Sequence, residues 1–128
     1  RLTPERDINA TLMSPEDIRE YHAHIYYDAE TQRAAAELRA ALAERFDVAL
    51  GRWRDEPVGP HPKAMYQVAF TPELFAEFVP WLMLNRRGLT ILVHPDTGQD
   101  VPDHEDHPLW LGEKLDLDIE KLRAFARA

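Results

Sequence analysis

The chain has 128 residues, of which 45% are hydrophobic and 30% are charged, a composition typical of a folded domain with a sizeable core. Its formal net charge is -8 and its basic residues form no cluster, which argues against nucleic acid or an anionic membrane as partner. The chain has no cysteine, which excludes disulfides, thiolate catalysis and cysteine-based zinc sites. No apolar run approaches the roughly 20 residues that span a bilayer, and no signal peptide is visible. We therefore expect a single domain over residues 1–128, located in the cytoplasm.

The first part of the chain predicts a helical turn, a strand and a helix. Residues 14–17 (SPED) form a helix-start signature. Residues 20–27 (EYHAHIYY) read as a strand with histidines at alternate positions. A helix is expected over residues 28–45, because apolar side chains recur there at three- and four-residue spacing, at Ala35, Leu38 and Leu42.

Two strands separated by a stiff loop follow. Residues 46–53 are rich in β-favouring side chains, with Gly51 as a weak point. Residues 56–62 contain three prolines and a glycine, which excludes regular structure and predicts a shaped loop. Residues 64–70 predict the third strand.

The last part of the chain predicts a helix, a strand, an acidic loop and a closing helix. The helix begins at residues 71–73 (TPE) and ends at residues 86–88 (RRG), and Pro80 inside it predicts a kink or a helix in two pieces. Residues 89–94 predict the fourth strand and residues 95–116 a loop. A short C-terminal helix carries the apolar positions Ile119, Leu122 and Phe125.

The order βαββαβ plus a terminal helix predicts an α+β fold of the ferredoxin-like type. In that fold a four-stranded antiparallel sheet has both helices on one face. The first and third strands are central, and the fourth lies beside the first. The other face must be covered by the acidic loop or by a second subunit, so we expect a homodimer.

Three histidines are expected on the uncovered face. Ala23 and Ile25 suit the helix-covered side, which leaves His22 and His24 pointing the other way. His94 ends the neighbouring strand, where the same alternation puts it on the face of His22 and His24. Imidazole suits iron, zinc, copper and nickel, so the three predict a shared metal site. The alternative is a set of polar residues in a solvated or subunit interface.

Further candidates lie around these histidines. His61, held between two prolines, suits acid–base chemistry, unless it is simply an exposed loop residue. His104 lies in the acidic loop, which is a lid, a ligand set or solvated charge. Tyr26 and Trp110 are candidates for an aromatic substrate pocket, with ordinary core positions as the more frequent alternative. Arg52 is a candidate for binding a substrate carboxylate, with a solvated strand end as the alternative.

Several motifs in order resemble the DOPA 4,5-dioxygenase family. They are YHAHIYY at residues 21–27, VGPHP at 58–62, LVHPDTG at 92–98, and the stretch from DH at 103–104 to LWLG at 109–112. The resemblance implies a small αβ protein that uses non-haem iron(II) and O₂ to cleave the ring of a catechol such as L-DOPA in the extradiol manner.

On this interpretation His22, His24 and His94 bind Fe(II), with zinc or another divalent metal as alternative occupants. His61 and His104 carry the acid–base chemistry. The substrate-binding residues are Tyr26, Arg52 and Trp110. Two other functions stay open: a metal-independent dimeric enzyme that uses histidine acid–base chemistry, and a non-catalytic module that binds a small molecule or a metal.

Overall fold

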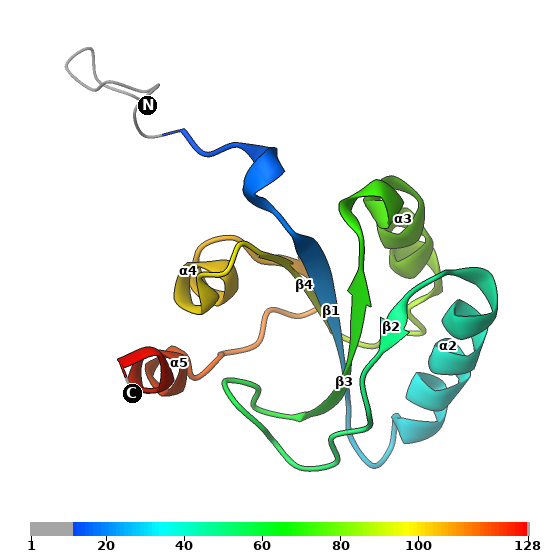
Figure 1. Ribbon diagram of the computed structural model, residues 1–128. Coiled ribbons are helices and arrows are strands. Elements are labelled where there is room, and N and C mark those ends of the chain that lie inside the picture. Colours follow the sequence, from blue (N-terminus) through cyan, green and yellow to red (C-terminus); the bar gives the residue numbers. More distant parts are fainter. Residues whose placement is uncertain (1–11, 128) are drawn as a thin grey trace.

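The computed structural model describes residues 12–127, so residues 1–11 and 128 of the predicted domain lie outside the description. Strands and helices alternate through the described part (Figure 1). With η marking 3-10 turns, the elements are η1 (Pro15–Asp17), β1 (Glu20–Tyr27), α2 (Gln32–Arg45), β2 (Ala49–Leu50), β3 (Ala64–Phe70), η2 (Pro72–Leu74), α3 (Phe75–Asn85), β4 (Ile91–Asp96), α4 (Asp100–Glu105), β5 (Leu109–Leu111) and α5 (Ile119–Arg127). Among the helices of residues 12–127, none has the length and apolar character needed to cross a membrane.

The sheet confirms the ferredoxin-like prediction and adds one strand to it. Its order is β2-β3-β1-β4-β5, with antiparallel pairing throughout. As predicted, β1 and β3 are central and β4 lies beside β1. The fifth strand, β5, pairs with β4 and forms the edge of the sheet beyond the predicted four strands.

The second strand is much shorter than predicted. Only Ala49 and Leu50 pair regularly with β3. At Gly51 the chain passes so close to β3 that a Cβ atom would lie 3.4 Å from the carbonyl oxygen of Gln67. The chain returns to β3 once more, where Arg54 pairs with Met65 in an isolated bridge. The β-favouring composition does indicate a strand here, but its ladder with β3 is interrupted after Gly51.

The acidic segment after β4 is not the loop that the sequence predicts. It contains α4 and β5, and β4 itself ends at Asp96 rather than at His94. A buried carboxylate explains the local order, because Asp103 accepts hydrogen bonds from the backbone N–H of Thr97 (2.8 Å) and from its hydroxyl (2.6 Å). These bonds fasten α4 to the end of β4. Charged residues hide α4 from a search for apolar periodicity, and β5, with only three residues, is too short for one.

Helix α3 runs through Pro80 as one helix, which contradicts the predicted division into two pieces. The change of helix type lies earlier, where η2 leads into α3. Thr71 adopts an extended backbone before Pro72, and Pro72 then opens the 3-10 turn, in agreement with the predicted helix start.

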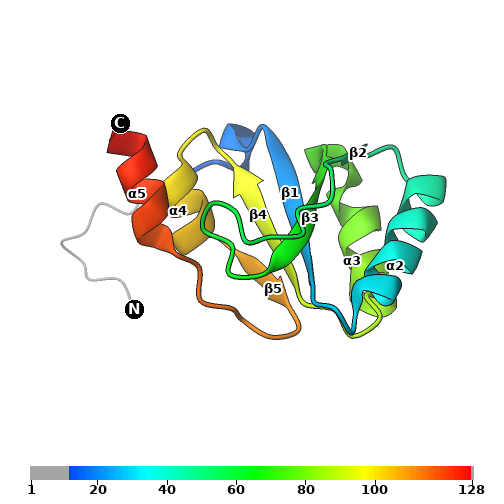
Figure 2. The ribbon, with the colours of Figure 1, turned by 90° about the horizontal axis from the view of Figure 1, so that it is seen from below.

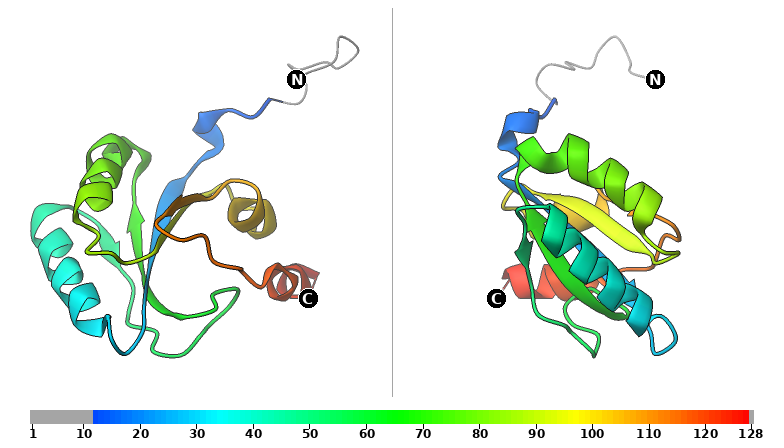
Figure 3. Two further views of the ribbon diagram at one scale, coloured as in Figure 1. Left: turned by 180° about the vertical axis from the view of Figure 1, so that it is seen from behind. Right: turned by 90° about the vertical axis from the view of Figure 1, so that its right-hand side faces the viewer.

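Helices cover the two faces of the sheet differently. Helices α2 and α3 lie side by side across one face (Figure 3), while α4 and α5 lie on the opposite side (Figure 2). The larger apolar core lies under α2 and α3 and includes Ile25, Val68 and Val93. A smaller cluster on the opposite face joins Tyr26, Met65 and Leu92 to residues of the C-terminal segment, namely Trp110, Leu115 and Leu117. The C-terminal segment therefore supplies the predicted cover.

Candidate metal centre

Three histidines meet on the α4 side of the sheet, where β1 and β4 run side by side. The strand register pairs His22 with His94, and His24 follows two positions later on β1. Because paired residues and alternate residues of a strand point to one face, the three side chains converge. The ring centroid of His94 lies 5.2 Å from that of His22 and 5.1 Å from that of His24. The structure thus brings together the three residues that the sequence predicts as ligands.

His61 reaches the same place from the proline-rich loop. The backbone N–H of His61 donates to the carbonyl of Val58 at 3.1 Å, which closes a turn within the loop. The His61 ring is buried, with its centroid 4.2 Å from that of His24. Its Nδ1 atom lies 2.7 Å from the hydroxyl oxygen of Tyr26, the next residue on this face of β1. The prolines therefore hold His61 at the site and not in solvent.

His104 completes a cluster of five histidines from the side of α4. Its ring centroid lies 4.0 Å from that of His94 and 6.1 Å from that of His61. Within α4 its Nδ1 lies 2.7 Å from the carbonyl oxygen of Asp100. His107, three residues further on, is exposed and lies outside the cluster, although it lines a cavity of about 400 Å³ together with His94 and Tyr21. We call His22, His24, His61, His94 and His104 the histidine cluster.

Backbone and carboxylate acceptors orient three members of the cluster. Nδ1 of His94 lies 2.8 Å from the carbonyl oxygen of Pro95, and His104 has its similar contact with Asp100. A carbonyl only accepts, so each Nδ1 carries the hydrogen and each Nε2 keeps a lone pair when the ring is neutral. His22 has its Nε2 atom 2.5 Å from a carboxylate oxygen of Glu20. Such outer partners orient histidine ligands at metal sites.

Burial keeps the inner histidines neutral. Burial, together with the positive charge that a protonated His104 would carry, lowers the pKa of His94 to about 3. The same two causes lower the pKa of His61 to about 4. Burial is the main cause that lowers the pKa of His24 well below its ordinary value of 6.5, and the neighbouring imidazoles lower this pKa further. The rings are therefore uncharged near neutral pH, the state in which imidazole binds a metal.

The donor atoms of the cluster fit a divalent metal. His22, His24 and His94 offer nitrogens that all lie within 4.8 Å of one another, and so do His24, His61 and His104. Nε2 of His24 and Nε2 of His94 are 3.0 Å apart. Two nitrogens at about 2.1 Å from one ion, with bonds at right angles, lie about 3.0 Å apart. In addition, Nδ1 of His24 is buried and has no hydrogen-bond partner among the described residues. An all-histidine donor set of this kind suits iron, zinc, copper or nickel.

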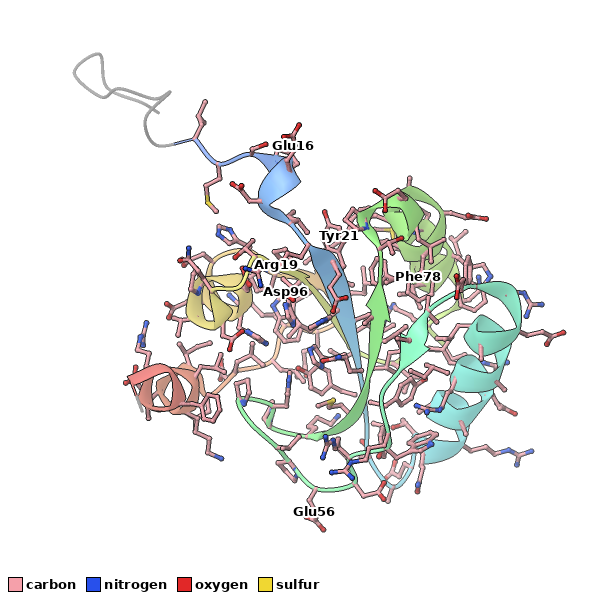
Figure 4. All side chains as sticks on the ribbon, viewed as in Figure 1. Glu16, Arg19, Tyr21, Glu56, Phe78 and Asp96 are labelled. Atoms are coloured by element: carbon pink, nitrogen blue, oxygen red, sulfur yellow. The ribbon has the colours of Figure 1, made fainter. Side chains whose placement is uncertain are left out.

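Carboxylates at the rim of this site were not recognised from the sequence. Glu20, His22 and Asp96 form a third group whose ligand atoms lie within 4.8 Å, and all three residues are half-buried. Asp96 stands beside Arg19 at the end of the sheet (Figure 4), where the Arg19 N–H donates to the Asp96 carbonyl at 2.9 Å. Glu20 precedes His22 by two residues, so strand alternation was the signal that could have placed the carboxylate beside the imidazole.

The predicted substrate-binding residues divide into two groups. Tyr26 and Trp110 lie together on the face of the histidine cluster, with stacked rings 6.2 Å apart. Trp110 and His104 also line a cavity of about 300 Å³ under the C-terminal segment. Arg52 is exposed in the segment between β2 and the bridge that Arg54 makes with Met65. Its role in substrate binding stays a prediction.

Fold and site together define a class: a small α+β protein with a cluster of five histidines, three of them buried, whose donor atoms suit a metal. The family model described as "Dopa 4,5-dioxygenase family" matches residues 21–121, which contain the whole cluster. The chain belongs to this family.

Individual relatives agree with that assignment. The DOPA 4,5-dioxygenase of Amanita muscaria is 39% identical over 128 residues, covering 93% of this chain and 55% of the relative. An uncharacterised protein of Botryotinia fuckeliana is 38% identical over 115 residues, covering 80% of this chain and 63% of the relative. The chain therefore spans about half to two thirds of the length of these relatives. A crystal structure from Nostoc punctiforme, described provisionally as a dioxygenase, is 55% identical with a TM-score of 0.88, covering 89% of this chain and 99% of that one.

Proposed function

We propose that the protein is a non-haem iron(II)-dependent dioxygenase that opens the ring of a catechol such as L-DOPA in the extradiol manner. The observation that carries the proposal is the convergence of His22, His24 and His94 on one buried point, with Nε2 atoms of two of them 3.0 Å apart. These three residues would hold the Fe(II). When bound, the metal would bring the catechol and O₂ together and stabilise negative charge on oxygen.

The overall reaction balances without a further reductant. A catechol and one O₂ give a ring-opened product in which both oxygen atoms are retained. The carbon–carbon bond next to the diol breaks, and an aldehyde and a carboxylate form at its two ends. The semialdehyde product is expected to be yellow and to cyclise.

Acid–base work falls to the residues of the cluster outside the proposed ligand set. His104 directs an Nε2 lone pair away from its Asp100 contact, so it is suited to accept a proton from a catechol hydroxyl. His61, buried beside His24, is the other candidate for acid–base or hydrogen-bonding chemistry. Burial of His61 keeps water away from this ring and strengthens its hydrogen bonds.

The cavity under the C-terminal segment is the proposed binding site for the catechol. It has a volume of about 300 Å³, the lower end of the range for small-molecule sites, and it borders His104. Trp110 supplies an aromatic wall, and Lys114 and Asp116 offer charges of both signs at its edge. Those charges suit the carboxylate and ammonium groups of an amino-acid catechol.

The proposed partners are the catechol, O₂ and a second copy of the chain. Strand β5 lies at the sheet edge, where one side of its backbone lacks a partner strand among the described residues, and Leu109 on it is 38% exposed. An exposed edge of this kind supports the homodimer proposal. Sedimentation of the purified protein measures it, and a monomer at micromolar concentration would contradict it.

The activity is tested by loading the protein with Fe(II) under anaerobic conditions and mixing it with O₂ and a panel of catechols. We expect a visible absorbance from the semialdehyde and uptake of one O₂ for each ring opened. His94→Ala should abolish both. His107→Ala, which changes a histidine of the same segment outside the cluster, should preserve them. Failure of every catechol to consume O₂ with fully iron-loaded protein would refute the proposed function.

A further inference from the structure

The outer partners of the cluster histidines are of two kinds. His22, His94 and His104 contact a carboxylate or a backbone carbonyl, and these groups only accept hydrogen bonds. His61 instead contacts the hydroxyl of Tyr26, at 2.7 Å from Nδ1. A hydroxyl both donates and accepts, so the direction of this one bond decides where the hydrogen of His61 lies.

The surroundings of Tyr26 decide that direction. The residue is 1% exposed, and its ring packs against Met65, Leu92 and Trp110. Among residues 12–127, the Tyr26 hydroxyl has Nδ1 of His61 as its hydrogen-bond partner and no second acceptor. If the hydroxyl accepted from Nδ1–H, its own hydrogen would be buried without a partner, at the full cost of desolvation. Donation to Nδ1 satisfies both groups.

We propose that Tyr26 is a positioning residue: its hydroxyl donates to Nδ1 of His61 and thereby fixes the tautomer with the hydrogen on Nε2. His61 then presents an N–H group, and not a lone pair, to the interior of the cluster. It is therefore a hydrogen-bond donor of the site and not a metal ligand.

This assignment separates the two overlapping ligand groups. The group of His24, His61 and His104 loses one donor atom, whereas the group of His22, His24 and His94 keeps its set. It also gives His61 and His104 different tasks. His104 offers a lone pair and can accept a proton, while His61 offers a neutral N–H that can stabilise negative charge on an oxygen of the bound substrate. This last role rests on the proposed function, whereas the tautomer does not.

The tautomer is measured directly on the unmodified protein. Long-range ¹H–¹⁵N correlation spectra of ¹⁵N-histidine-labelled protein distinguish a protonated from an unprotonated ring nitrogen, and a His61→Gln spectrum identifies the signals. We expect His61 to have hydrogen on Nε2 in the metal-free protein and to keep it when Zn(II) is added. Hydrogen on Nδ1, or a shift of His61 Nε2 to a zinc-bound position, would overturn the proposal.

Variants test the same assignment through metal affinity. His61→Ala should change the Zn(II) affinity by no more than about threefold, whereas His24→Ala should weaken it by about 100-fold or more. Equal losses in the two variants would contradict the proposed role of His61.

The chain supplies a matched control for Tyr26. Tyr66 is also buried and donates one hydrogen bond, to the carbonyl of Ala35 at 2.8 Å on the helix-covered face. Tyr26→Phe should remove the single His61 tautomer and lower kcat for catechol about 10- to 100-fold with little change in KM. Tyr66→Phe should leave the tautomer and kcat unchanged. The same kcat loss in both variants would mean that Tyr26 acts only through stability.

The spectra and Zn(II) titrations require no turnover. An inactive protein with hydrogen on His61 Nε2 would refute the proposed function and leave this inference standing. An active protein with His61 bound to the metal would support the proposed function and refute this inference.

Discussion

The two faces of the central strands bury different chemistry. On the α2 and α3 side, β1 and β4 contribute apolar side chains such as Ile25 and Val93 to the main core. On the other side the same strands contribute His24 and His94, each less than 4% exposed, with a small apolar cluster beside them. Because side chains alternate along a strand, the apolar residues that stabilise the fold lie on one face and the histidines on the other. A register slip of one residue would exchange the two sets. Changes on one face should therefore be distinguishable from changes on the other.

Acid should reveal the difference between the two faces most strongly. The buried histidines stay neutral in the folded protein, whereas in the unfolded chain they are free to bind protons. The pKa of His94 is about 3 and that of His61 about 4 in the folded protein, while unfolded histidine titrates near 6.5. Below pH 6.5 the unfolded chain binds more protons, so stability present above that pH is lost as the pH falls toward the folded pKa values. Each buried neutral imidazole should lower the free energy of unfolding by about 1.4 kcal/mol for each pH unit below 6.5.

Urea unfolding of the metal-free protein between pH 7.5 and pH 5 measures this loss. His61→Gln should reduce the slope by the contribution of one ring, which makes the variant an internal control. A stability that stays constant down to pH 5 would show that the cluster histidines are not held neutral by burial.

Removal of His24, which belongs to both overlapping ligand groups, should have the largest effect on catalytic function. His24 belongs to both overlapping ligand groups, so His24→Ala should lower catechol turnover by about 1,000-fold or more. The substitution also removes a buried ring and its Nε2 contact with His94 at 3.0 Å, so turnover is compared at equal concentrations of folded protein, determined from urea unfolding at pH 7.5. Turnover is measured by O₂ uptake. A variant that kept a tenth of the activity would exclude His24 from the metal site.

The opposite pattern, a loss of stability with little effect on metal binding, is expected for Ile25, the residue after His24, whose side chain points to the other face. Ile25→Ala removes a fully buried side chain from the main core and should lower the free energy of unfolding by about 3 kcal/mol. Zn(II) affinity of the folded fraction, measured by titration at low temperature, should change by less than about threefold. A large loss of affinity would show that the two faces are coupled.

The smallest effect is expected at the rim. Glu20 is a half-buried partner of His22, with its carboxylate 2.5 Å from Nε2 of that ring, and it orients the ring from outside the inner cluster. Glu20→Gln should weaken Zn(II) binding by about tenfold, at the lower end of what second-layer partners of metal ligands contribute. Glu16→Gln, on η1, carries the same charge change and should leave the affinity unchanged. Equal losses would indicate a general charge effect.

Periodicity was sufficient to predict the main elements of the fold. Strands β1 and β3 have the predicted bounds, because alternation and β-favouring residues agree there over seven or eight positions. Helix α2 was marked by its apolar stripe, and the element order then defined the ferredoxin-like sheet. What could not be predicted are α4 and β5, whose order depends on contacts with residues outside each element. Asp103 bonds to Thr97, and Leu109 pairs with Val93.

The site was predicted in part for the same reason. Alternation and strand order placed His22, His24 and His94 on one face, as the register now confirms. The proline loop and the acidic segment marked His61 and His104 as candidate functional residues, but the sequence did not predict where either ring lies relative to the other histidines. The roles of Tyr26 and Glu20 depend on single hydrogen bonds, which no spacing rule in a sequence specifies.

One backbone hydrogen bond joins the two coverings of the site. The N–H of Asp118, in the segment that leads into α5, donates to the carbonyl of Pro60 at 2.8 Å, next to His61. The C-terminal segment therefore cannot move away from the sheet without breaking this bond to the loop that carries His61. Opening of the segment would therefore also remove one contact of the loop that carries His61. The hydrogen-exchange rate of this single amide should consequently report how often the site opens, and a bound catechol should slow it.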